Sequence, residues 1–312
     1  MTPDSTDATL GVSEAGYRRR FRDPAFGQDL AEIVAARHGL PRPLVRKVEG
    51  SSLVFRAGDG PWLKLTPPFW AHDVEAEILA TMAVAGRLPT RIPELIETGA
   101  IEDWRYLISA DVPGEPFQAI EDELSAAERE ALAEDLGAFM RAFHAVEAPE
   151  LGGPLWRDDL QARLAEPVAT HAARGTAPAW LDPIADHLAR HAAALLALGP
   201  PVLIHADLTA EHVMLARGAC RWRLSGVLDL ADSMAAPAEL DLAAPFVELF
   251  RGEAALQARL AAAAGVRVVS PGFTMAIAMQ HRFFRLDEWF APEIGAGCST
   301  VEAVAAAAFP LL

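Results

Sequence analysis

Apolar and polar positions in the first third of the chain follow a mixed pattern of helices and strands. Residues 29–38 (DLAEIVAARH) carry apolar side chains at helical spacing and end before Gly39, which predicts a helix with a glycine stop. Residues 46–67 then alternate short β-rich runs with glycines, the pattern of a hairpin or a small antiparallel sheet. Lys64 lies inside the last of these apolar runs. We therefore expect a helix followed by antiparallel strands.

A second helical pattern covers residues 71–88 (AHDVEAEILATMAVAGRL) and ends near Gly86. Four of its apolar residues are spaced as one face of a helix, with Glu75 and Glu77 among them. That predicted face consists of Val74, Ile78, Leu79 and Met82. Two short β-like runs, PELIETGAI and RYLISADV, come next. The first part of the chain is therefore predicted to form an α+β lobe.

Strand patterns nearly vanish from Leu124 onward. Ser125 and Glu128 form a capping box, and a helical apolar stripe follows them, made of Leu132, Leu136, Phe139 and Phe143. Further helical patterns cover residues 157–173, 180–198, 237–264 and 272–290. Three short β-like runs interrupt them: PVLIHADL, HVMLA and RLSGVLDL. We expect a poorly ordered lead-in over residues 1–20, an N-lobe over 21–112 and a mostly helical C-lobe over 113–312.

Composition and charge narrow the class of protein. A hydrophobic content of 52% over 312 residues is enough to fill a core. A formal charge of −16 repels nucleic acid and attracts cations. No segment has the order of a signal peptide or the ~20 apolar residues of a membrane span, and the two cysteines are far apart and in no CxxC pattern. We expect a cytoplasmic protein, monomeric or homodimeric, with no nucleic-acid or membrane partner.

The β-like runs of the C-lobe carry the candidate chemistry. His205, Asp207 and His212 have the spacing H-x-D-x4-H, the form of a kinase catalytic loop, in which a metal ligand follows the acid. Asp229 ends an apolar run seventeen residues after His212. The phosphates of ATP need Mg²⁺, Mg²⁺ needs hard oxygen ligands, and an acceptor hydroxyl needs a carboxylate within hydrogen-bond reach. With Lys64 in an N-terminal strand, these acids predict phosphoryl transfer.

Several short motifs then resemble those of the aminoglycoside phosphotransferase family, which is related in fold to protein kinases and choline kinases. HADLTAEH is similar to the family's HGDLxxxN, GVLDL to GxIDW, APAELDLA to GDPxxDLA, and LGAFMRAFH to LGxxLAxLH. The similarity in pattern spans about residues 25–290, and DGPWLKL resembles the hygromycin B phosphotransferase branch. The resemblance implies a bilobal, protein-kinase-like α+β fold with a small antiparallel N-lobe and a larger helical C-lobe.

The resemblance also implies roles for the reacting centre. Asp207 would be the catalytic base, and Asp229 would hold Mg²⁺ between the phosphates. Lys64 would contact the α- and β-phosphates of ATP and would be anchored by Glu75, which we prefer to Glu77 because it matches the family's ExxxL helix.

The same resemblance assigns the rest of the nucleotide site. Gly50, Ser51 and Ser52 would cover the phosphates with backbone amides. Ser109 and Asp111 would offer main-chain hydrogen bonds to the adenine.

Two positions of the catalytic loop depart from the family's pattern. His212 stands where the family usually has Asn; an imidazole suits Mn²⁺ better than Mg²⁺, so His212 is either a metal ligand or a structural residue. Ala206 replaces a glycine, which permits a tight loop if its φ stays below zero. His205 is expected to pin the loop by hydrogen bonds, and Asp241 to brace it.

Acidic residues in the C-lobe linkers are the candidates for binding a cationic acceptor. They are Glu211, Asp232, Glu239, Asp287 and Glu288. We expect an ATP-dependent phosphotransferase that acts on a hydroxyl of a small molecule, first an aminoglycoside or aminocyclitol resembling hygromycin. The alternatives are a kinase of another metabolite, such as choline, homoserine, a sugar or a macrolide, and a nucleotide-binding protein without turnover.

Overall fold

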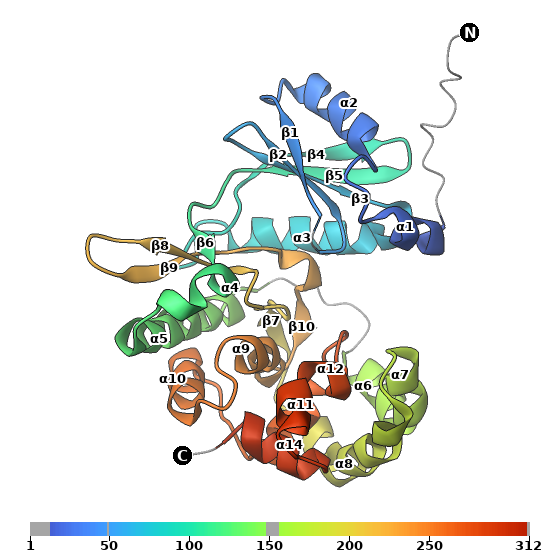
Figure 1. Ribbon diagram of the computed structural model, residues 1–312, viewed down its shortest axis with the longest axis vertical. Helices are drawn as coiled ribbons and strands as arrows, with labels where there is room; N and C mark the ends of the chain where they lie inside the picture. The colour runs from blue at the N-terminus through green and yellow to red at the C-terminus, as the bar shows by residue number, and fades with distance from the viewer. Residues whose placement is uncertain (1–12, 49, 148–155, 311–312) are drawn as a thin grey trace.

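The computed structural model describes residues 13–48, 50–147 and 156–310, which form two lobes joined by a short connection (Figure 1). The N-lobe is one five-stranded antiparallel sheet in the order β1-β2-β3-β5-β4. Its strands are β1 (Leu44–Lys47), β2 (Leu53–Ala57), β3 (Trp62–Thr66), β4 (Leu95–Ile101) and β5 (Trp104–Ser109). Its helices are α1 (Glu14–Arg20), α2 (Gln28–His38) and α3 (Ala71–Val84), with the 3₁₀ turn η1 (Pro68–Trp70) before α3.

The start of the chain is ordered earlier than the sequence suggests. The predicted lead-in over residues 1–20 lies partly outside the described residues, at 1–12, but it is wrong for 14–20, which form α1. The side chain of Ser13 caps this helix, and Tyr17 is only 1% exposed. The Tyr17 ring packs on Phe26 and Trp104 and its hydroxyl donates to the carbonyl of Ser51 at 2.6 Å. Burial of one aromatic side chain therefore stabilises a segment that is otherwise polar.

Helix α3 buries a different face from the one predicted. Leu79 and Met82 are 37% and 66% exposed. The buried positions are Val74, Glu77, Ala80 and Val84. This set also has helical spacing, but it includes an acid, and hydrophobicity alone does not select it. The helix therefore turns Glu77, and not Glu75, toward the sheet and the C-lobe.

The connection between the lobes passes close to the C-lobe sheet. Gly114 has a φ of 141°, and a Cβ there would lie 2.6 Å from the carbonyl oxygen of Leu215. Only glycine fits at that place. The short strand β6 (Glu115–Pro116) then pairs with β8 (Val213–Arg217), which pairs in turn with β9 (Trp222–Val227). The chain thereby enters the C-lobe directly beside the strands that flank the catalytic loop.

The C-lobe is mostly helical, as predicted, and has its own apolar core. Helix α5 (Ala126–His144) has the predicted capping box and buries the predicted stripe. Helix α4 (Phe117–Ile120) and the turn η2 (Glu121–Glu123) precede it. The other helices are α6 (Trp156–Ala165), α7 (Pro167–Ala173), α8 (Pro178–Leu196), α9 (Ala243–Glu248), α10 (Ala254–Ala264), α11 (Pro271–Ala278), α12 (Leu286–Trp289), α13 (Ala291–Gly295) and α14 (Val301–Ala308).

Two short elements of the C-lobe differ from the prediction. β7 (Val202–Ile204) pairs with β10 (Met234–Ala236), a strand that the sequence pattern did not indicate. The turns η4 (Leu230–Asp232) and η5 (Ala238–Leu242) flank β10. The helix predicted over 272–290 is interrupted between α11 and α12, and that interruption contains His281. Its Nε2 lies 2.9 Å from the carbonyl oxygen of Ala206, so a contact with the catalytic loop accompanies the break.

Candidate active site

The catalytic loop begins at His205, directly after β7. Its imidazole is fully buried, and Nε2 lies 3.0 Å from the carbonyl oxygen of Leu228. Nδ1 accepts from the backbone N–H of Asp207 at 3.3 Å, so the proton of the neutral ring lies on Nε2 and is donated to Leu228. Burial lowers the pKa of His205 and favours that neutral form. The expected role of His205, pinning the loop, is confirmed.

The peptide groups of Ala206 are held from both sides. Its N–H donates to Oδ1 of Asp241 at 2.7 Å, and its carbonyl accepts from His281. Oδ2 of Asp241 lies 2.8 Å from Nε2 of His144, which confirms that Asp241 braces the loop. The condition of a φ below zero at Ala206 is not met, because φ is 68°, in the left-handed region. These hydrogen bonds hold a conformation that an alanine does not favour on its own.

Asp207 follows with its carboxylate between two imidazoles. Oδ2 lies 3.4 Å from Nδ1 of His212, and Oδ1 lies 3.6 Å from Nε2 of His281. Burial alone would raise the pKa of Asp207, but these two histidines hold it below the ordinary value. The side chain is therefore an ionised carboxylate near neutral pH, the form that accepts a proton from a hydroxyl.

His212 presents one ring nitrogen to the carboxylates. Its Nδ1 lies 2.9 Å from the carbonyl oxygen of Asp207, which only accepts, so Nδ1 carries the proton. Nε2 faces Oε1 of Glu211 at 3.7 Å and Oδ2 of Asp229 at 3.8 Å. Burial would lower the pKa of His212, but Asp229 and Asp207 raise it above the ordinary value. A histidine fixed through Nδ1 to a carbonyl, with Nε2 toward carboxylates, has the arrangement of a metal ligand.

Lys64 joins the two lobes at this point. Its Nζ donates to Oε2 of Glu77 at 2.8 Å and to Oδ1 of Asp229 at 2.9 Å. Burial would raise the pKa of Asp229, but Lys64 and His212 hold it far below the ordinary value. The prediction that Glu75 anchors Lys64 is wrong: Glu75 is solvent-exposed and pairs with Arg105 at 3.4 Å, because α3 turns Glu77 inward.

A cavity of about 420 Å³ opens between the lobes beside Lys64. Both the loop after β1 and the end of β5 contribute to its walls, so the predicted nucleotide residues come together there. Those residues are Gly50, Ser51, Ser52, Ser109 and Asp111. The indole N–H of Trp62 donates to Oδ1 of Asp111 at 2.7 Å, so an aromatic ring stands at the same wall. Glu77, His212 and Asp229 also line this cavity, whereas Glu75 does not.

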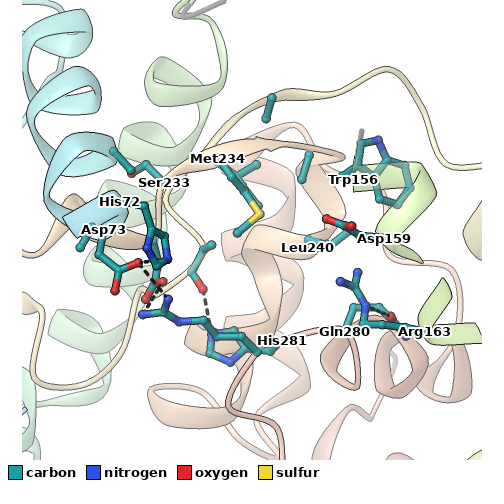
Figure 2. A pocket seen from close by; sticks show the side chains of 18 of the residues that line it. His72, Asp73, Trp156, Asp159, Arg163, Ser233, Met234, Leu240, Gln280 and His281 are labelled. Carbon is teal, nitrogen blue, oxygen red and sulfur yellow. Dashed lines mark hydrogen bonds and ion pairs between the residues drawn. The ribbon is translucent and has the colours of Figure 1, made fainter. Parts of the chain in front are cut away.

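A second cavity, of about 410 Å³, lies on the C-lobe side (Figure 2). Its walls come from α3, α6, the segment from η4 to β10 and the interruption after α11. The apolar part consists of Ala76, Trp156, Ile204, Met234, Leu240 and Ile277. Ala206 and His281, which flank Asp207, also line it. A molecule in this second cavity would therefore lie near Asp207, whereas the first cavity, which we call the nucleotide cavity after the residues predicted for it, is lined by Lys64 and Asp229.

Only one of the five carboxylates predicted to bind the acceptor lines this second cavity. It is Asp232, whose Oδ1 lies 2.6 Å from Nη2 of Arg282. Glu211 lines the nucleotide cavity instead. Glu239, Asp287 and Glu288 line neither, and the last two pair with Arg285. These three acids stand on helical turns away from both cavities, so Asp232 alone of the five candidates lies where an acceptor could bind.

Sequence reasoning missed several residues of the second cavity. Their positions lie on α3, on α6, after α7 and after α11: Asp73, Asp159, Arg163, Arg174, His281 and Arg282. The segment HRFFRLDEWF was noted only for its aromatic residues. A signal did exist there, since two basic residues open a segment that is otherwise apolar and aromatic. Its partner on the catalytic loop is 75 positions away in sequence, and no spacing rule connects them.

Two negative findings concern the described residues alone. Within the three described segments, no helix has the length and apolar character that a membrane crossing requires. Among the same residues, no three side chains of His, Cys, Asp or Glu are grouped so that they would hold a metal ion by themselves.

Comparisons with known proteins agree with this architecture. A model of the phosphotransferase enzyme family matches residues 45–276. Among solved structures, the GDP complex of aminoglycoside 2'-phosphotransferase-IIIa is 14% identical, with a TM-score of 0.69 over 88% of this chain and 94% of that one. No curated protein matches the sequence significantly.

Two further solved structures are similar to the chain. The streptomycin–ATP–APH(2")-IIa ternary complex is 17% identical, with a TM-score of 0.57 over 88% of this chain and 93% of that one. Macrolide 2'-phosphotransferase MphH from Brachybacterium faecium is 21% identical, with a TM-score of 0.55 over 91% of this chain and 99% of that one. At these identities the similarity concerns the fold, and it confirms the predicted bilobal, kinase-like α+β architecture.

Proposed function

The chain belongs to the phosphotransferase enzyme family and is a small-molecule kinase; we propose that it transfers the γ-phosphate of ATP to a hydroxyl of an acceptor bound beside Asp207. One observation carries this proposal. The carboxylates of Asp207 and Asp229 lie within 4 Å of the same imidazole, His212, while Lys64 reaches Asp229 from the other lobe. A phosphate donor on one side and an alcohol on the other would meet at this point.

The proposed chemistry needs few protein groups. Asp207, ionised and held by its two neighbouring histidines, orients the acceptor hydroxyl and accepts its proton as the new bond from oxygen to phosphorus forms. The bond between the γ-phosphorus and the oxygen of the leaving ADP breaks in the same step. Lys64 would contact the phosphate chain, and the backbone of Gly50, Ser51 and Ser52 would cover it.

The side chains beside the phosphates fit one divalent cation shared with ATP. Asp229 offers an oxygen ligand, and Nε2 of His212, which faces it, would offer a nitrogen ligand once the cation displaces its proton. Mg²⁺ is usually held by one or two protein ligands together with phosphates, so two ligands suffice. The bound cation would neutralise phosphate charge. The nitrogen ligand favours Mn²⁺ more than the usual Asn would, so we propose Mg²⁺ with Mn²⁺ as an effective substitute.

An aminoglycoside or aminocyclitol, including compounds resembling hygromycin, is the first proposed acceptor class. Two of the similar solved structures are aminoglycoside phosphotransferases. The second cavity contains the acids Asp73, Asp159 and Asp232 that ammonium groups would contact. Expression of the chain would then raise the antibiotic concentration that a susceptible bacterium survives, which a growth assay measures.

A kinase of a smaller hydroxylated metabolite is the second candidate, and a specific observation favours it. The same cavity also contains Arg163, Arg174 and Arg282, so its charge is mixed and not predominantly negative. Such a wall gives a polycation no net attraction, whereas a metabolite that carries an acidic group finds arginine partners in it.

An acceptor screen tests the proposal. Purified protein, ATP and Mg²⁺ are incubated with aminoglycosides, macrolides, choline, homoserine and sugars, and products are detected by the mass gain of one phosphate. We expect at least one acceptor to gain a phosphate and the gain to disappear in Asp207→Ala. Nucleotide binding without turnover across the whole panel would instead support a binding protein.

A further inference from the structure

The second cavity, where we propose that the acceptor binds, is called the acceptor cavity from here on. One end of it contains two arginines without an acidic partner in the described part of the chain. Arg163 lies on α6 and donates from Nε to Oε1 of Gln280 at 3.3 Å. Arg174 follows α7 and donates from Nη1 to the carbonyl oxygen of Met279 at 2.9 Å. Each guanidinium has five N–H donors. Most of these donors therefore have no partner among the described residues.

The two guanidiniums are half-buried and close enough to affect each other. Burial, together with the charge of Arg163, lowers the pKa of Arg174 to about 10. Burial also lowers the pKa of Arg163, against the opposing charge of Asp159. Asp159 is exposed, and its oxygens lie beyond ion-pair distance of Arg163. Two like charges and one exposed acid leave this end of the cavity positive.

The other end of the cavity has its acids already paired. Arg282 contacts Asp232 at 2.6 Å and Asp73 at 3.6 Å, and His72 lies 3.0 Å from Asp73. Figure 2 shows His72 and Asp73 on one side of the cavity and Asp159 and Arg163 on the opposite side, with His281 between them. The protein therefore supplies counter-charges at one end and leaves the opposite end for the ligand to neutralise.

We propose that the acceptor carries an oxyanion, a carboxylate or a phosphate monoester, which Arg163 and Arg174 bind while its hydroxyl lies against Asp207. This inference rests on the proposed phosphoryl transfer. The planar guanidinium fork matches the two oxygens of such a group, so one anion satisfies donors from both arginines. The apolar wall that contains Trp156 and Met234 covers the uncharged body of the molecule.

Matched acceptors test the charge preference. Glucose, glucuronate and glucose 6-phosphate share one ring and differ in one group, and kanamycin represents a polycation. With ATP and Mg²⁺ in excess, we expect kcat/KM for one or both acidic sugars to exceed that for glucose about 10- to 100-fold, mostly through KM. The two acidic members separate a carboxylate from a phosphate. A clear preference for kanamycin would overturn the inference while leaving the phosphotransferase proposal intact.

Arginine variants connect the preference to these residues. Arg163→Gln and Arg174→Gln should each remove most of the advantage of the acidic sugars and leave KM for ATP unchanged, whereas Arg163→Lys should retain part of it. Arg217→Gln is the matched control, because Arg217 is an exposed arginine on β8 that pairs with Glu123. An unchanged acid preference in both cavity variants would overturn the assignment.

Binding of inorganic phosphate gives a readout that does not need turnover. With ADP and Mg²⁺ present at saturation, phosphate should raise the melting temperature of the wild-type chain more than that of the Arg163→Gln/Arg174→Gln double variant. If no sugar is phosphorylated but this difference is found, the anion site stands and the proposed reaction fails. Equal shifts in the two proteins would count against the anion site.

Discussion

The nucleotide cavity and the acceptor cavity have almost equal volumes, about 420 and 410 Å³, but they differ in how their charged side chains are paired. In the nucleotide cavity, the buried cation Lys64 is neutralised by two protein carboxylates. In the acceptor cavity, Arg163 and Arg174 have no such partner among the described residues. A site with its own counter-ions is fixed before the ligand arrives, whereas a site that lacks them selects its ligand by charge.

The largest expected effect is on turnover, when Asp207 is replaced. Asp207→Asn should reduce kcat about 10²- to 10⁴-fold, because the amide cannot accept the hydroxyl proton. Nucleotide affinity should stay nearly the same, since Asp207 does not line that cavity. Steady-state kinetics and titration with a fluorescent nucleotide measure the two quantities. An equal loss of nucleotide binding would assign Asp207 to the metal or to the structure of the loop.

Removing one counter-ion of Lys64 tests whether the nucleotide cavity depends on its internal charges. Glu77→Gln should lower kcat/KM for ATP about 10- to 100-fold, because it replaces a charged hydrogen bond inside the cleft with a neutral one. Glu75→Gln is the control two residues away and should stay within about twofold, since Glu75 is exposed. A larger loss in Glu75→Gln than in Glu77→Gln would instead support the sequence prediction that Glu75 anchors Lys64.

The free energy of unfolding should fall at acidic pH because of one buried histidine, His171. Burial, together with the charge of Arg174, lowers the pKa of His171 to about 4, so the native state favours the neutral ring. A depressed folded-state pKa gives stability that is complete above the unfolded value near 6.5 and is lost as pH falls toward 4. At about 1.4 kcal/mol for each pKa unit, the loss by pH 4.5 should be roughly 2–3 kcal/mol.

The variant His171→Leu isolates this contribution. Urea unfolding at pH 7 and at pH 4.5 should show a smaller acid-induced loss in the variant than in the wild type. The imidazole stands edge-on to the ring of Phe284 at 5.6 Å, and leucine keeps an apolar contact there. Parallel stability–pH curves for the two proteins would show that His171 is not the titrating group.

The preference for Mg²⁺ over Mn²⁺ should change when His212 is replaced. His212→Asn replaces a nitrogen ligand with an oxygen ligand, so activity with Mg²⁺ relative to Mn²⁺ should rise about tenfold. Initial rates at matched free-metal concentrations provide the ratio. An unchanged ratio would make His212 a structural residue that holds the carbonyl of Asp207.

The smallest expected effect concerns the backbone of Ala206, which lines the acceptor cavity. Ala206→Gly should raise the free energy of unfolding by about 0.5–1 kcal/mol, because glycine relieves the strain of a positive φ but adds entropy to the unfolded chain. Chemical denaturation with unchanged kcat is the expected result. A loss of stability would mean that the Ala206 methyl contributes packing that outweighs the strain.

The residues of the nucleotide cavity were predicted from the sequence more accurately than those of the acceptor cavity, for a physical reason. Lys64, Ser51 and Ser109 stand on strands or tight loops, where a local pattern fixes the place of each residue. The family's ExxxL pattern favours Glu75 over Glu77. Two helical faces with acceptable spacing compete on α3, and packing against the rest of the fold buries the face with Glu77.

The acceptor cavity depends on contacts between distant parts of the chain. Arg163 meets Gln280 across 117 positions, and His281 meets Ala206 across 75. Apolar periodicity indicates which side of a helix is buried, but it does not tell which helix will lie opposite. The same limit applies to β10, whose partner β7 is some thirty residues earlier in the chain. Five acids were candidates for the acceptor because of their charge and their place in the C-lobe linkers, and only Asp232 among them lines this cavity.

The hydrogen bond from Tyr17 to Ser51 extends the functional unit beyond the segment that the family model matches. That segment begins at residue 45, whereas α1 ends at Arg20. A chain shortened to begin at residue 21 would release the carbonyl of Ser51 and uncover the rings of Phe26 and Trp104. The first helix thus supports the loop that we propose to cover the phosphates, and its removal should weaken ATP binding without changing any residue of the proposed catalytic centre.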